Sequence, residues 1–399
     1  MPTGPRSPSR SSAEIAAPQS GRVAEFLRQC FRSPCEPTPP LDAVLDAVLD
    51  DDRVPALLQA VDLHRVASTL AEHRELFEAA PSTASGIRGL HLAASRDALQ
   101  LMALTTSACS LLDDAGIRAL VMKGIGLAAV QGRGPSSRGS GDLDLWVHDD
   151  DIARTVEVLR SLGYRPEEPA AVTLVTSRSR RARMYRWITP EVTLLHDDGP
   201  PIDLHFRLLR STSHVPIDFG SAWGRSVVIP GTHEQGRTLC AGDALRHSSA
   251  HATKDCWDTL RHVVDVVHLA RAVDGAELTR LCETDRSVDL AVAVASNLDP
   301  QLGRFRSSSA RTTRLARTAW TMCLSLAMRP QTIATQPTMT NIRSRAAVLI
   351  WQVRTSPDAR TALHPIIEAP LSMRALSDPA PLPIGVLKDL VARTRENRT

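Results

Sequence analysis

The amino-acid sequence predicts an α+β fold in which a small mixed β-sheet lies between two helical regions. Short segments with alternating apolar and polar residues occupy the middle of the 399-residue chain, whereas apolar residues recur every three or four positions on both sides of it. Breaks rich in Gly, Pro and Ser separate the short segments. These patterns predict a disordered N-terminal tail over residues 1–21, an N-terminal helical region over 22–99, a core with the sheet over 100–235 and a C-terminal helical region over 236–399.

Helical periodicity recurs in five parts of the chain. The predicted helices are residues 22–31, 42–73, 101–115 and 148–164, and the pattern is helical again from about residue 240 to the end, with breaks near residues 330 and 381. Gly116 provides a terminating residue for the third of these helices. Three aspartates at the start of the fourth are explained by the preference of helix N-termini for negative charge.

The strands are expected in the stretches with alternating or continuous apolar character. They are residues 117–123, 142–147, 183–188, 191–197 and 202–209. A short helix near residues 125–131 and a Gly- and Ser-rich loop join the first two strands.

Composition places the chain among globular proteins. Hydrophobic residues make up 43% of the sequence, and the net charge of +3 is too small to indicate a nucleic-acid-binding protein by itself. The seven cysteines include no Cys-x-x-Cys pair, which argues against a disulfide framework or a cysteine zinc site. No signal-peptide pattern and no run of about 18 apolar residues is visible, so we expect a cytoplasmic protein without a membrane partner.

Two carboxylates stand on one face of the strand predicted over residues 142–147. Side chains alternate along a strand, so Asp142, Asp144 and Trp146 point to one side. Two carboxylates this close raise each other's pKa unless a cation or a cluster of donors lies between them. The pattern indicates a divalent metal ion, and the alternative of a polar strand end capped by Arg138 stays open.

A third carboxylate, Asp203, is the second residue of the strand predicted over residues 202–209. If this strand lies beside residues 142–147, Asp203 converges with Asp142 and Asp144. Such a group can hold two magnesium ions, the usual way to stabilise the attacking and the leaving oxygen in phosphoryl or nucleotidyl transfer.

Four motifs carry a resemblance to a known family. They are VMKGIGLAAV, SSRGSGDLDLWV, IDLHFRL and HSSAHATKDCWDTLRHVVDVVHLA. In this order they resemble the uncharacterised nucleotidyltransferase family related to the DNA polymerase beta superfamily, over about residues 100–270. The resemblance implies that Asp142 and Asp144 are paired metal ligands and that Asp203 is the third carboxylate, which helps to activate the acceptor hydroxyl. It also implies that Gly124 lets the backbone approach a phosphate.

Further residues are candidates for contacts to the nucleoside triphosphate. They are Lys123, Gly124, Arg138, Ser140, His251 and Lys254. Most members of the superfamily carry Gly-Ser or Gly-Gly where this chain has Gly124 and Ile125. We therefore expect the charges of Lys123 and Arg138 to bind phosphate in place of the missing hydroxyl.

A helix predicted around residues 247–270 carries a polar stripe. Its members recur at three- and four-residue steps and are His247, His251, Lys254, Asp258, His262 and Asp265. Such a stripe is often a solvated face, but the resemblance places this helix against the nucleotide, which favours a role for His251 and Lys254. A zinc site from His247 and His251 fits the spacing, with no third ligand evident in the sequence.

Residues 124–129, GIGLAA, also match the dinucleotide-binding fingerprint G-x-G-x-x-A. Gly132, Gly134 and Pro135 cut the following helix short, and no further βαβ repeat follows. Both features argue against a Rossmann fold.

We expect a magnesium-dependent enzyme of the two-metal type that moves a nucleoside monophosphate from an NTP to an acceptor hydroxyl and releases pyrophosphate. A peptide, protein or small molecule is favoured as the acceptor. RNA is the alternative, through the basic segment Arg178–Arg186 with its neighbouring Tyr185 and Trp187. The second interpretation is a catalytically inactive binding or regulatory protein of the same fold, against which the three carboxylates argue.

Overall fold

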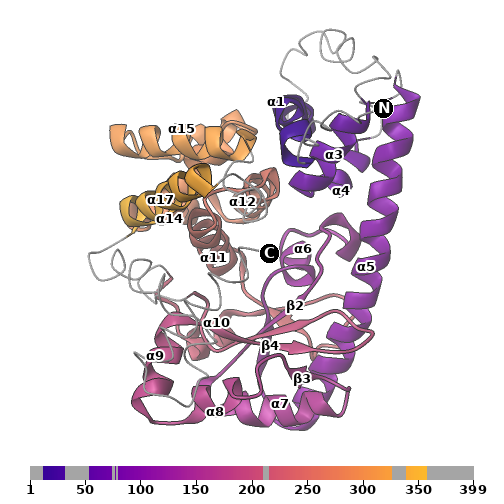
Figure 1. The fold of residues 1–399 in the computed structure, drawn as a ribbon, viewed down its shortest axis with the longest axis vertical. Helices are drawn as coiled ribbons and strands as arrows, with labels where there is room; N and C mark the ends of the chain where they lie inside the picture. The colour runs from indigo at the N-terminus through magenta and orange to yellow at the C-terminus, as the bar shows by residue number, and fades with distance from the viewer. Residues whose placement is uncertain are drawn as a thin grey trace, which may run out of the picture. The chain divides into compact units, whose positions relative to one another are not determined.

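The computed structural model describes residues 12–31, 54–73, 77, 80–209, 215–325 and 338–356 (Figure 1). The chain divides into two compact units. The unit called here the sheet unit comprises Ala94–His251, His268–Val288 and the described residues from Leu349 on. The helical unit comprises the described residues up to Ala93, together with Ala252–Val267 and those of Asp289–Val348.

A mixed sheet organises the sheet unit. Among the described residues, seven strands follow the order β3-β4-β5-β2-β1-β7-β6. They are β1 (Ala119–Val121), β2 (Leu143–Val147), β3 (Arg165–Pro166), β4 (Glu191–Leu195), β5 (Ile202–His205), β6 (Val227–Val228) and β7 (Arg237–Thr238). β2 pairs with β5 in parallel, as β1 does with β7, and the other neighbours are antiparallel. This mixed sheet, with helices before and after it in the chain, confirms the predicted α+β fold.

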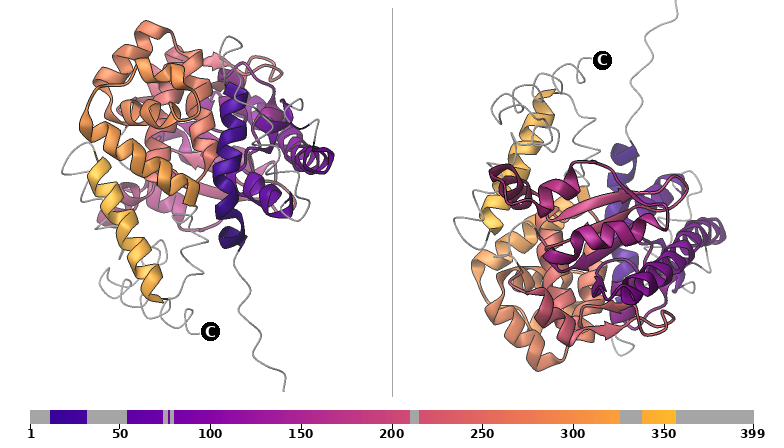
Figure 2. Two further views of the ribbon diagram at one scale, coloured as in Figure 1. Left: turned by 90° about the horizontal axis from the view of Figure 1, so that it is seen from above. Right: turned by 90° about the horizontal axis from the view of Figure 1, so that it is seen from below.

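One face of the sheet is apolar and forms the core of this unit. Leu143 and Leu145 of β2 are buried there. Residues of α7 (Ile152–Arg160) and of the later part of α5 (Pro81–Asp114) pack against them (Figure 2). Their burial fixes the register, because a slip of one residue would turn every leucine to the other face. Asp144, which lies between the two leucines, must then point to the opposite face.

The sheet contradicts the dinucleotide-binding alternative. β1 and β2 precede and follow α6 (Ile125–Val130), and they are antiparallel neighbours, with Ala119 opposite Val147. A Rossmann unit requires two parallel strands joined by that helix. The GIGLAA segment therefore belongs to a different fold.

Residues 183–188 are helical, so the strand predicted for them is wrong. They lie in α9 (Arg180–Ile188). The Ser179 hydroxyl caps this helix by accepting a hydrogen bond from the Ala182 backbone N–H at 3.1 Å. Ala182 and Tyr185 are three residues apart and are both fully buried. The mixture of arginine and aromatic residues thus follows a helical spacing and not the alternation of a strand.

Further helices belong to the sheet unit. They are α8 (Ala171–Thr176), α10 (Phe219–Arg225), α13 (Gly275–Thr284) and most of α11 (Ala241–Lys254).

The helical unit combines helices that precede the sheet in the chain with helices that follow it. They are α1 (Ser12–Phe31), α3 (Val54–His64), α4 (Ala67–Ala71) and α15 (Ala310–Ser325), with most of α12 (Leu260–Ala272), α14 (Arg286–Ala295) and α17 (Thr338–Thr355). α1 begins at Ser12, so residues 12–21 of the expected disordered tail are helical. Residues 42–53 and the break near residue 381 lie outside the described residues. None of the described helices has the length and apolar character that crossing a membrane requires.

A buried histidine connects three segments within the helical unit. His64 is fully buried, and its Nε2 lies 2.9 Å from the Ser20 hydroxyl oxygen. The backbone N–H of Leu260 donates to His64 Nδ1 at 3.1 Å. Because Nδ1 accepts, Nε2 carries the proton and donates to Ser20. Both ring nitrogens are therefore satisfied, as burial requires.

Candidate functional site

Five polar side chains share the sheet face opposite the apolar core. On the parallel strands β2 and β5, Asp144 is opposite Asp203. On β5 and β4, Asp203 is opposite Thr193 and His205 is opposite Glu191. Side chains at paired positions point to the same side of a sheet. We call these five residues the polar face, and the expected position of Asp203 beside the strand of Asp144 is confirmed.

Asp144 is the most buried carboxylate of the polar face, with 1% of its side chain exposed. Lys123 Nζ donates to its Oδ1 at 2.7 Å, and His205 Nε2 lies 3.0 Å from the same oxygen. Burial by itself would raise the pKa of Asp144, but the charge of Lys123 and the hydrogen bond from His205 outweigh burial and hold the pKa below its ordinary value. The second carboxylate oxygen, Oδ2, is buried and has no hydrogen-bond partner.

Lys123 supplies the positive charge that keeps Asp144 ionised. It lies two residues after the end of β1, and 22% of its side chain is exposed. Burial works against its charge, but Asp144 more than compensates, and the pKa of Lys123 is raised above its ordinary value. Lys123 and Asp144 therefore form an ion pair in which the carboxylate is buried and the ammonium group is partly exposed to solvent.

The carboxylate of Asp203 is repelled by neighbouring negative charges, unlike that of Asp144, which has Lys123 as its counterion. Thr193 donates its hydroxyl to Asp203 Oδ1 at 2.8 Å. Burial, and next the negative charge of Glu191, raise the pKa of Asp203; Asp144 adds to this increase. A divalent cation between these carboxylates would relieve the repulsion, because hard cations prefer oxygen ligands.

Asp142 stands just before β2, at a partly buried position, and accepts a hydrogen bond from the Ser140 hydroxyl at 3.0 Å. Ser140 also contacts the turn that follows Lys123. A Cβ atom added to Gly124 would lie 3.0 Å from both Cβ and Oγ of Ser140. The loop before β2 and the turn between β1 and α6 therefore meet, and the structure brings together Lys123, Gly124, Ser140 and Asp142.

Gly124→Ala is expected to destabilise the protein. Gly124 has φ of +52°, which an alanine adopts only with strain, and the new methyl group would press on Ser140. We expect the melting temperature to fall by several degrees, which corresponds to about 1–2 kcal/mol. Thermal unfolding followed by circular dichroism checks this, with Gly134→Ala as the control, because Gly134 has φ of −69° and open space around it. An unchanged melting temperature in Gly124→Ala would contradict the argument from strain.

Three members of the polar face, Glu191, Thr193 and His205, are absent from the site residues expected from the sequence. His205 lies on the same strand as Asp203 and bonds Asp144, and Glu191 Oε2 is 3.2 Å from His205 Nε2. The alternation of residues 191–195 predicts that Glu191 and Thr193 lie on one face of a strand. Which face that is depends on the pairing of β4 with β5, and no local pattern reveals this pairing.

A comparison with known families places this geometry in context. A family model described as an uncharacterised nucleotidyltransferase matches residues 50–298, more than half of the chain. The chain belongs to this family. The match includes Lys123, the three aspartates and His205, and it supports nucleotidyl transfer as the general activity rather than the inactive alternative. Comparisons with curated proteins and with solved structures gave no match.

The nucleotidyltransferase family match also extends over α11, which carries two of the predicted nucleotide contacts. His251 lies on α11, 5.9 Å from the ring of His247, and Lys254, its last residue, forms an ion pair with Asp255 at 3.3 Å. Arg138 follows a 3-10 turn at Pro135–Ser137. Contacts of these three residues to a nucleotide stay predictions.

The single helix predicted around residues 247–270 is two helices. α11 ends at Lys254 and α12 begins at Leu260, because Cys256 and Trp257 between them adopt positive φ values of 57° and 54°. His262 and Asp265 therefore lie on a different helix from His247.

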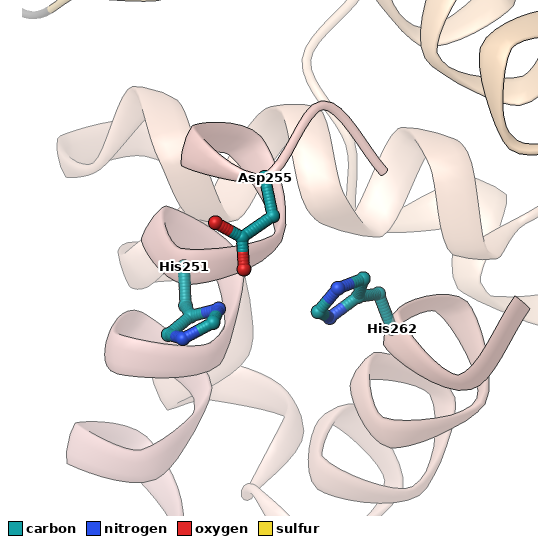
Figure 3. Close-up of side chains that lie close together, drawn as sticks. All are labelled: His251, Asp255 and His262. Carbon is teal, nitrogen blue, oxygen red and sulfur yellow. The ribbon is translucent and has the colours of Figure 1, made fainter. Parts of the chain in front are cut away.

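The zinc ligands suggested by the sequence, His247 and His251, differ from the cluster of potential metal ligands in the structure. Among the described residues, the group whose ligand atoms all lie within 4.8 Å of one another is His251, Asp255 and His262, from this helix–turn–helix segment (Figure 3). His247 is not part of it, and the three aspartates do not approach one another as closely.

The basic segment predicted to contact RNA has one aromatic side chain that is buried. Tyr185 is fully buried inside α9, whereas Arg178 and Arg183 are exposed. A buried ring cannot stack on a base. The side chain of Trp187 lies outside the described part of the structure. Its expected role as a stacking surface stays a prediction.

Proposed function

We propose that the sheet unit transfers a nucleoside monophosphate from a nucleoside triphosphate to an acceptor hydroxyl and releases pyrophosphate, with two magnesium ions as cofactors. The observation that carries this proposal is the pairing of Asp144 with Asp203 on adjacent parallel strands, with Lys123 bonded to Asp144. Membership of the nucleotidyltransferase family supports the general activity.

Asp142, Asp144 and Asp203 would hold the magnesium ions. Carboxylate oxygens are the ligands that this ion prefers. The buried Oδ2 atom of Asp144 has no hydrogen-bond partner, which fits an oxygen that takes a cation. Bound there, the ions would stabilise negative charge on the attacking and the leaving oxygen.

Asp203 would accept the proton of the acceptor hydroxyl. Its raised pKa brings the carboxylate closer to the range in which it exchanges protons, and Thr193 orients it. In the transfer step the acceptor oxygen forms a bond to the α-phosphorus, and the bond between that phosphorus and the bridging oxygen breaks. Pyrophosphate leaves with the electron pair of the broken bond.

Lys123 would bind the phosphates of the donor. Its ammonium group neutralises Asp144 in this structure, and a cation bound to Asp144 would free the ammonium group for phosphate oxygens. Gly124 would let the backbone approach a phosphate at the turn, and Ser140, Arg138, His251 and Lys254 are the further proposed contacts. His205 would keep Asp144 in one orientation by its hydrogen bond.

The proposed acceptor is a hydroxyl group on a peptide, a protein or a small molecule. The burial of Tyr185 supports this choice over RNA, because it leaves the basic segment with fewer surfaces for base stacking.

A magnesium-dependent nucleotide shift in thermal melts is the expected result that tests the proposal. Wild type is melted with each of the four NTPs, with and without magnesium. A ligand that binds the folded state at about a hundred times its Kd adds about 2.7 kcal/mol of stability, a rise of a few degrees. The same melts use a variant carrying Asp142→Asn and Asp144→Asn, and the control Asp150→Asn, which changes a highly exposed carboxylate.

We expect magnesium and an NTP to raise the melting temperature of wild type and of Asp150→Asn. We expect no such rise in the double variant. The absence of a shift with every NTP would contradict nucleotide binding. A shift that the double variant keeps would show that these aspartates do not hold the metal.

A further inference from the structure

His247 is a fully buried histidine whose ring has no hydrogen-bond partner. Only 1% of this residue is exposed, and neither Nδ1 nor Nε2 has a partner among the described residues. His64, equally buried in the helical unit, has both ring nitrogens bonded. An unpaired polar group inside a protein costs stability, so its presence points to a partner that arrives with a ligand.

The surroundings of His247 connect it to the polar face. His247 belongs to the part of α11 inside the sheet unit, one turn before His251. The titratable groups that act on its ring are His251, Lys123, His205 and Asp144. Three of these form the hydrogen-bonded group around the Asp144 carboxylate. The ring therefore lies within electrostatic range of the proposed nucleotide site.

The imidazole of His247 is neutral at physiological pH. Burial, and then the electrostatic interactions with His251 and Lys123, lower the pKa of His247 well below its ordinary value. A neutral ring offers one N–H donor and one acceptor nitrogen. A nucleotide presents complementary groups, since its phosphate oxygens accept hydrogen bonds and its ribose hydroxyls donate them.

We propose that His247 is a nucleotide-binding residue whose ring N–H donates to a phosphate oxygen of the nucleoside triphosphate held beside Lys123. This inference rests on the proposed function and deepens it. A phosphate is favoured over a metal ion because the ammonium group of Lys123 acts on the His247 ring more strongly than the carboxylate of Asp144 does. His247 is also absent from the close group of metal-ligating atoms among the described residues.

Two substitutions separate a ligand contact from a structural role. His247→Leu removes both polar atoms from a site where they have no partner, so the nucleotide-free protein is expected to melt at or above the wild-type temperature. The affinity for magnesium–NTP, measured by titration calorimetry on the full chain, is expected to weaken at least about tenfold. His247→Gln keeps a donor and an acceptor and is expected to bind within about threefold of wild type.

His64→Leu is the matched control. It removes a buried histidine whose partners, the Ser20 hydroxyl and the Leu260 N–H, are then left unsatisfied. We expect its melting temperature to fall by several degrees with unchanged nucleotide affinity. The opposite responses of two equally buried histidines distinguish a binding residue from a structural one.

Unchanged affinity in His247→Leu, a melting temperature several degrees below wild type, or an equal loss of affinity in His247→Gln would overturn the assignment. These results concern His247 only when wild type binds magnesium–NTP. If wild type itself binds no nucleotide, the proposed function fails together with the inference.

Discussion

Asp144→Asn is expected to reduce the rate of nucleotidyl transfer at least about a hundredfold. The asparagine keeps the shape of the side chain but loses the negative charge that a divalent cation needs. The Oδ2 atom, which is buried without a hydrogen-bond partner, is the position that the substitution changes most. The loss would come from the metal site and not from unfolding, because Lys123 is partly exposed and can turn its ammonium group to water.

The rate is measured as transfer of label from an NTP carrying a radioactive α-phosphate, with a cell extract as the source of acceptors. Asp150→Asn serves as the control and should transfer label at the wild-type rate, because its carboxylate is exposed. Circular dichroism verifies that Asp144→Asn is folded at the assay temperature. Transfer at the wild-type rate by Asp144→Asn would remove Asp144 from the metal site.

Two carboxylates of the polar face, Asp144 and Asp203, could be predicted from the sequence because the alternation of apolar and acidic residues is the same in their two strands. Leu143 and Leu145 alternate with Asp144, and Ile202 and Leu204 flank Asp203. Burial of those four apolar side chains forces both aspartates to the other face of the sheet. Local alternation therefore determines where the acids point, once their two strands are neighbours.

The partners of Asp144 could not be predicted in the same way. Lys123 lies 21 residues away in the chain, and His205 lies 61 residues away. Their contact depends on the order of the strands, in which β2 lies between β1 and β5. Hydrophobic patterns identify strands but do not specify their neighbours.

The break between α11 and α12 escaped prediction for a different reason. Helices usually end at Gly or Pro, yet here Cys256 and Trp257 adopt positive φ values without either residue. Both side chains are buried, with Trp257 fully enclosed. Tertiary packing therefore holds a conformation that local propensity disfavours, and the polar stripe is divided between two helices.

Lys123→Met is expected to lower the free energy of unfolding by about 3 kcal/mol or more. It leaves the carboxylate of Asp144 inside the protein without its counterion, and the neighbouring Glu191 and Asp203 add further repulsion. The control Arg160→Met breaks an exposed ion pair with Glu157 and should change the free energy by less than about 1 kcal/mol. Urea unfolding of both variants and of wild type measures the difference. A Lys123→Met variant as stable as wild type would contradict the ion-pair argument.

Combining Lys123→Met with Asp144→Leu is expected to recover most of the lost stability, because an apolar pair can replace a buried ion pair at little cost. The recovered protein should show no magnesium-dependent response to NTPs, since it lacks both a carboxylate for the metal and a charge for phosphate. If the double variant is as stable as wild type but inactive, the ion pair is not needed for folding. The ion pair is then explained by function. Asp144 is needed to bind a magnesium ion, and Lys123 is needed to bind the triphosphate.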